Sequence, residues 1–219
     1  MGAFNQQDHE DIAAILSNPF LKYWVAENLD AANHSKLRPL PLGMVFNDEP
    51  QIRDLVAVPI SPPLLDRPVK ALCGHRLRPG EQWDTRRKVS ALAAHEWSDW
   101  CTTLEDEVSE TAFIDLIRQH AFVICVAGGG LDPSPKAWLA LLHGAIPVIK
   151  RSALDDAYAH LPVAFVDEWS AESLSLERLT RWQNDYAPIF DQSGLRRAMQ
   201  KRLSLDYWWD YAINIEAHH

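Results

Sequence analysis

The chain has 219 residues, 47% of them hydrophobic, and its 21 basic and 30 acidic side chains give a net charge of −9 at pH 7. This size and composition are enough to bury a core, and the acidic balance disfavours a general binder of nucleic acid. The sequence has no apolar run of the roughly 18 residues that would suggest a membrane helix, and no basic leader followed by an apolar stretch. We therefore expect no membrane span and no signal peptide.

Residues 1–68 predict an N-terminal appendage and linker. Residues 8–28 have the pattern of a helix followed by a short strand, and proline-punctuated connectors follow at 37–43 and 58–69. Neither connector has the alternation of strand and helix that a second full domain would need.

From residue 69 to residue 219, short apolar runs alternate with amphipathic patterns. Strands are predicted at 69–73, 100–104, 121–127, 146–150 and 162–167. Helices are predicted at 85–97, 109–120, 153–161, 174–190 and 193–213, and one more after the glycines described below. Such alternation indicates right-handed βαβ units. The predicted fold class is therefore α/β, a Rossmann-like open parallel sheet of about five strands with helices on both faces.

Residues 122–149 contain the strongest candidate for a ligand site. Gly128, Gly129 and Gly130 directly follow a strand pattern, and glycine permits a positive φ and a close approach of ligand to backbone. Asp132 or Ser134 is expected to cap the next helix, and Gly144 to end it. A helix that begins at the carboxyl end of a parallel strand suits a phosphate or diphosphate. Because the glycines fit neither the Walker nor the GxGxxG pattern, a flexible turn is the alternative interpretation.

Three segments, taken in order, resemble the exostosin-like glycosyltransferases, and specifically the nucleotide-sugar half of their two-domain GT-B architecture. They are YWVAENLDAANHSKLRPLPLGM at 23–44, FVICVAGGGLDPSPKAWLALLHGAIPVI at 122–149 and LDDAYAHLPVAFVDEWS at 154–170. The resemblance covers roughly residues 23 to 211. It implies a domain similar to the C-terminal domain of a GT-B enzyme at 69–219, which binds a UDP- or GDP-linked sugar and transfers the glycosyl group to an acceptor hydroxyl.

Charged residues after two of the predicted strands are the candidate substrate-binding groups. The resemblance implies that a cation after the first strand neutralises the departing diphosphate, and Arg76 is the first candidate, with a solvated basic turn as the alternative. Lys136 is misplaced for the helix dipole and well placed for a phosphate. The full predicted set of substrate-binding residues is Arg76, Arg78, Gly128, Gly129, Gly130, Asp132, Ser134 and Lys136. No acid–base residue can be assigned, and no Asp-x-Asp triplet or metal-ligand spacing of histidines is present, so we predict no metal and no cofactor beyond the donor.

Two positions depart from the family pattern, with Lys136 in place of an arginine and Leu139 in place of a ribose-binding glutamate. Lysine keeps the charge without the bidentate fork, and leucine accepts no hydrogen bond. The alternative function is therefore a non-catalytic scaffold or binding protein that keeps the fold without the donor site. A third hypothesis is another phosphate-handling α/β enzyme.

The expected partners follow from the leading hypothesis. They are a nucleotide sugar and a carbohydrate acceptor, with a partner chain or homo-oligomer supplying the acceptor side, and no nucleic acid. Cys73, Cys101 and Cys125 are odd in number and widely separated, which favours reduced thiols and a cytoplasmic location.

Overall fold

The computed structural model describes residues 6–30, 34–44, 58, 60–104 and 106–214. Its main feature is a five-stranded sheet in the order β4-β3-β5-β6-β7, in which every neighbouring pair is parallel. The strands are β3 (Ala71–Cys73), β4 (Cys101–Thr103), β5 (Phe122–Ile124), β6 (Ile146–Lys150) and β7 (Ala164–Val166). The predicted α/β class and the Rossmann-like open sheet are confirmed.

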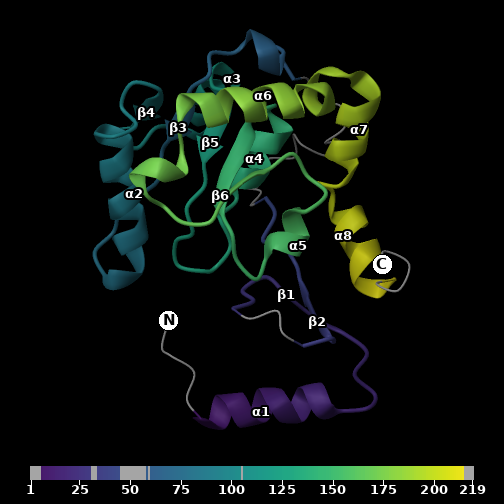
Figure 1. The fold of residues 1–219 in the computed structure, drawn as a ribbon. Helices are drawn as coiled ribbons and strands as arrows, with labels where there is room; N and C mark the ends of the chain where they lie inside the picture. The colour runs from purple at the N-terminus through teal and green to yellow at the C-terminus, as the bar shows by residue number, and fades with distance from the viewer. Residues whose placement is uncertain (1–5, 31–33, 45–57, 59, 105, 215–219) are drawn as a thin grey trace.

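Helices connect and flank these strands. They are α2 (Asp84–Ala94), α3 (Glu110–Gln119), α4 (Lys136–Leu142), α5 (Asp155–Tyr158), α6 (Leu176–Asp191), α7 (Ser193–Lys201) and α8 (Leu205–Ile213), with 3-10 turns η2 (Leu64–Asp66), η3 (Glu81–Trp83) and η4 (Ala171–Ser173). In Figure 1, α2 lies on the side of β4, and α7 and α8 lie on the opposite side of the view. Since parallel crossovers are right-handed, α2 covers the face opposite to α3, α4 and α5.

The central strand β5 is apolar throughout because both faces of the sheet are covered. Residues 121–126 are at most 1% exposed, and Trp138 of α4 packs at 1% exposure beside them. The predicted strand at 121–127 is longer than β5, because pairing with β3 stops at Val123 and pairing with β6 stops at Ile124. The backbone that follows is therefore available for the loop at the candidate site.

Two helix predictions need correction. The expected helix at 193–213 is two helices, because Leu203 turns into the core at 4% exposure and the Ser204 hydroxyl accepts a hydrogen bond from Tyr207 N, at 3.2 Å, to start α8. The expected helix at 85–97 ends at Ala94, and Trp97 is anchored by its ring N–H to the Ala171 carbonyl at 3.1 Å.

The N-terminal part contains α1 (Gln6–Ser17), β1 (Trp24–Ala26) and β2 (Leu37–Pro39), and the two strands form a separate parallel pair. Figure 1 shows α1 set apart from the five-stranded sheet, with β1 and β2 between them. Among the residues described, no helix has the length and apolar character needed to cross a membrane.

The strand order creates a topological switch point. From β3 the chain moves to β4 on one side, and it then returns to place β5 on the other side of β3. The loops that leave β3 and β5 therefore diverge at the carboxyl edge of the sheet, which is where doubly wound sheets bind ligands.

Candidate functional site

The two segments that the sequence singles out meet at this switch point. Residues 74–80 follow β3, residues 125–135 follow β5, and the two strands are hydrogen-bonded neighbours. The predicted basic turn and the predicted glycine turn are therefore brought together at one edge of the sheet.

Arg86 of α2 ties these two loops together. It is 8% exposed, and its Nε and Nη2 donate to the carbonyls of Ala127 and Val126, each at 3.2 Å. Its Nη1 donates to the Arg76 carbonyl at 3.3 Å, and the guanidinium lies 4.7 Å from the centre of the Trp83 ring. Burial lowers the pKa of Arg86. The hydrogen-bond partners of this buried guanidinium are therefore backbone carbonyls of the two loops.

The three glycines have different roles. A Cβ on Gly128 would lie 2.8 Å from Arg86 Cζ and 3.0 Å from the Trp83 ring. A Cβ on Gly130 would lie 2.5 Å from Asn28 Oδ1, which accepts a hydrogen bond from Leu131 N at 2.8 Å. A Cβ on Gly129 would meet nothing within 4 Å. Gly128 and Gly130 therefore make room for protein side chains, and Gly129 faces open space.

Gly128, Gly129 and Gly130 do not use the positive φ that glycine permits. The positive-φ glycines among the described residues are Gly43, Gly80 and Gly144, and the last, with φ of 82°, ends α4 as predicted. The left-handed residue in the loop is Ser134, with φ of 90°, between Pro133 and Pro135.

Asp132 is a structural link in this loop. It is 5% exposed, and its Oδ2 accepts hydrogen bonds from Tyr158 OH at 2.8 Å and from Leu42 N at 3.1 Å. Its Oδ1 accepts from Ser134 N at 2.8 Å. Burial, followed by the charge of Asp132 and its hydrogen bond, raises the pKa of Tyr158. The carboxylate thus joins α5 and the segment after β2 to the loop.

The predicted capping of α4 by Asp132 or Ser134 is wrong. The helix begins at Lys136, so the N-cap position falls on Pro135, which has no side chain able to cap. The turn at Ser134 delays the helix start, and the Ser134 hydroxyl accepts a hydrogen bond from Lys136 N at 3.4 Å.

Lys136 is a cation in the first turn of α4. It is half-buried, and within the described part of the chain no group accepts a hydrogen bond from its ammonium or forms an ion pair with it. Burial lowers its pKa to about 8; the thiols of Cys125 and Cys73 oppose this effect, and Arg86 adds to it. These interactions locate the ammonium near the ends of β3 and β5.

The two predicted arginines lie on the exposed rim. Arg76 Nε is 2.9 Å from Glu107 Oε1, and both side chains are more than half exposed. Arg78 lies 5.7 Å from the centre of the Trp83 ring. Neither guanidinium makes the buried contacts that Arg86 makes, so both keep the freedom of surface side chains.

Sequence reasoning missed His75 and Cys73, which also belong to this site. His75 Nδ1 is 3.8 Å from Cys73 Sγ, and its Nε2 lies 3.1 Å from the Arg86 carbonyl and 3.0 Å from Ser90 Oγ. The available signal was the two-residue spacing at the end of a strand. Within the described residues, no group of three or more His, Cys, Asp or Glu side chains could hold a metal ion.

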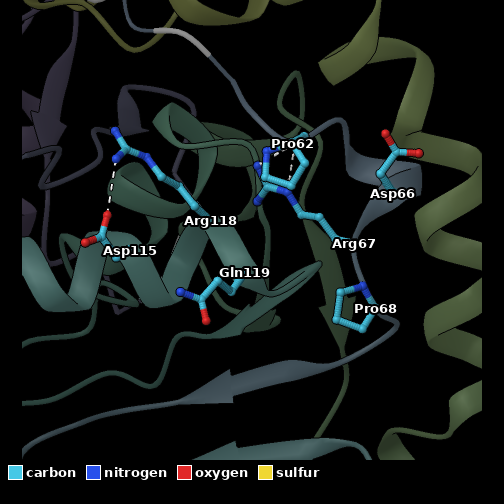
Figure 2. A pocket seen from close by; sticks show the side chains of 7 residues that line it. All are labelled: Pro62, Asp66, Arg67, Pro68, Asp115, Arg118 and Gln119. Atoms are coloured by element: carbon cyan, nitrogen blue, oxygen red, sulfur yellow. Dashed lines mark hydrogen bonds and ion pairs between the residues drawn. The ribbon is translucent and has the colours of Figure 1, made fainter.

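A cavity lies at the opposite, amino edge of the sheet. It measures about 510 Å³, and Figure 2 shows its lining of Pro62, Asp66, Arg67, Pro68, Asp115, Arg118 and Gln119. Arg67 donates to the carbonyls of Pro62, Ile117, His120 and His143, and burial lowers its pKa to about 10. Arg118 pairs with Asp115 at 3.3 Å. Because both cations are already engaged by the protein, this cavity is a weaker candidate for an anion than the switch point.

No family model matches this chain, and no curated protein matches it significantly. The fold and the site together define an α/β protein with several cationic side chains at the switch point of a parallel sheet.

Proposed function

We propose that the chain is a nucleotide-sugar-binding domain of the glycosyltransferase class, with the diphosphate of the donor in the switch-point crevice. The observation that carries the proposal is the half-buried ammonium of Lys136, which has no partner among the described residues. A cation that is partly removed from water without a hydrogen-bond or ion-pair partner is costly, and an anionic ligand offsets that cost.

The surrounding groups suit a diphosphate. Gly129 has open space where a side chain would stand, so a phosphate can approach the backbone there. The exposed guanidinium groups of Arg76 and Arg78 can add charge from the rim. The contribution to glycosyl transfer would be electrostatic stabilisation of the leaving diphosphate.

The remaining parts of the proposal concern partners. The acceptor would be a carbohydrate hydroxyl, and its acid–base residue would come from a partner chain or a second copy of this one. The described cysteines are all buried and unbridged, which supports a cytoplasmic location.

A specific observation favours the non-catalytic alternative. The space beside Gly128 is filled by Arg86, the space beside Gly130 is filled by Asn28, and the carboxylate of Asp132 is bound by Tyr158. Three predicted substrate groups therefore serve the protein itself. Leu139, which stands where the resemblance implies a ribose acceptor, packs against the core.

A thermal-shift panel separates these functions. UDP, GDP, ADP, CMP and their common sugar conjugates are tested against the wild type, Lys136→Ala and Lys88→Ala, a control for an exposed lysine on α2. One nucleoside diphosphate should stabilise the wild type and Lys88→Ala, by about 2.7 kcal/mol at about a hundred times its dissociation constant. Lys136→Ala should fold normally and lose this effect.

The other outcomes are equally informative. A flat panel with a folded, monodisperse protein would reject donor binding and favour the scaffold. Stronger protection by inorganic phosphate than by any nucleoside diphosphate would point to a different phosphate-handling enzyme.

A further inference from the structure

The carboxyl end of β3 holds a thiol beside an imidazole. Cys73 is the last residue of β3, is 4% exposed, and has its Sγ 3.8 Å from His75 Nδ1. His75 is half-buried, and its other nitrogen is fixed by the Arg86 carbonyl at 3.1 Å. The chain therefore presents a nucleophile, a base and a group that orients the base.

The partners of His75 determine which nitrogen carries the proton. A carbonyl oxygen only accepts hydrogen bonds, so the contact with Arg86 O places the proton of the neutral ring on Nε2. Nδ1 then has its lone pair available, and Cys73 Sγ is its neighbour. In this tautomer the imidazole accepts the thiol proton.

The surroundings also favour the thiolate of Cys73. Neighbouring Cys101, and after it His75 and the Lys136 ammonium, lower the pKa of Cys73. Burial opposes this effect without reversing its direction. Burial instead raises the pKa of Cys125 to about 12, and neighbouring Cys73 together with burial raises that of Cys101. One chain thus contains a candidate reactive thiol and two internal controls.

We propose that Cys73 and His75 form a modification site at which hydrogen peroxide oxidises Cys73 to a sulfenic acid. His75 Nδ1 takes the thiol proton, and the thiolate sulfur attacks one peroxide oxygen. The S–O bond forms as the O–O bond breaks, and the departing hydroxide takes the proton from Nδ1 and leaves as water. The sulfur loses two electrons, which reduce the peroxide, so one peroxide yields one sulfenic acid and one water.

Site-resolved alkylation tests this proposal without any nucleotide. The folded protein is exposed briefly to limiting iodoacetamide at about pH 6, quenched, digested, and quantified at each cysteine by mass spectrometry. Cys73 should react about tenfold or more faster than Cys101 and Cys125, because little thiolate of an ordinary cysteine exists at that pH. Prior treatment with hydrogen peroxide should block Cys73, and dithiothreitol should restore it.

Two variants test the role assigned to His75. In His75→Gln the Cys73 rate should fall steeply between about pH 8 and pH 6, whereas the wild-type rate should change little over that range. Ser90→Ala removes another contact of His75 and keeps the pair, so its rate should stay within about threefold of the wild type. Reaction of Cys73 only in urea, or equal rates at the three cysteines in the folded wild type, would overturn the proposal, and neither result depends on whether the chain binds nucleotides.

Discussion

Replacement of Gly128 by alanine should destabilise the protein through a side chain forty-two positions away in the sequence. The added Cβ would lie 2.8 Å from Arg86 Cζ and 3.0 Å from the Trp83 ring, so the guanidinium must move. Arg86 donates three hydrogen bonds to loop carbonyls from a buried position. Loss of two of them, at about 1.5 kcal/mol each, predicts about 3 kcal/mol less stability.

Gly129→Ala is the matched control. Its Cβ would meet nothing within 4 Å, and its φ lies outside the left-handed region, so alanine should fit without strain. The free energy of unfolding should stay within about 0.5 kcal/mol of the wild type.

Urea unfolding followed by tryptophan fluorescence measures both variants. If Gly128→Ala and Gly129→Ala unfold at the same urea concentration, the assignment of Arg86 as the group that occupies the Gly128 space is incorrect. The same pair also tests the proposed function, because Gly129→Ala should weaken protection by a nucleoside diphosphate while it keeps the stability of the apo protein.

Three further predictions concern charge. Burial lowers the pKa of Lys136 to about 8, and a bound anion would raise it. Nucleotide affinity measured by calorimetry should therefore be constant below about pH 7 and fall as the pH rises through 8. A constant affinity up to about pH 10 would exclude Lys136 as the anion ligand. Burial lowers the pKa of His143 from 6.5 to about 4, so between these pH values the imidazole binds a proton in the unfolded chain and not in the folded one. Urea titrations should show that about 3 kcal/mol of stability is lost by about pH 4. His143→Phe should abolish this loss. Glu107→Gln should release Arg76 and tighten nucleotide binding about twofold to fivefold in the same calorimetric assay, and unchanged or weaker binding would place Arg76 outside the site.

The fold was predictable because burial on both faces leaves a strong pattern. Runs such as 121–127 are apolar without interruption, and polar helical faces separate them. The order of the strands was not predictable, because nothing local in the sequence states that β5 pairs with β3 on the side away from β4. The switch point, which brings the two candidate loops together, follows from the order of the strands and is therefore visible only in the tertiary structure.

The loop after β5 was predictable from the sequence, and the contacts that its residues make were not. Glycines after a buried strand indicated the loop correctly, but the reasons for Gly128 and Gly130 are Arg86 and Asn28, which reach them from distant parts of the chain. Asp132 looks like a local helix cap in the sequence. Two of its three hydrogen bonds come from residues 26 positions later and 90 positions earlier, and such contacts leave no local signal.

The side chains of Arg86, Lys136 and Arg76 differ in how strongly contacts within the protein already hold them. Arg86 is buried and fully engaged with carbonyls, so its release would leave several polar groups unpaired. Lys136 is half-buried and unpaired within the described chain, and Arg76 is held only by an exposed ion pair that contributes at most about 1 kcal/mol. A diphosphate carries more negative charge than one ammonium balances. The arrangement therefore favours a ligand that contacts Lys136 first and then draws Arg76 away from Glu107, while Arg86 holds the two loops in place.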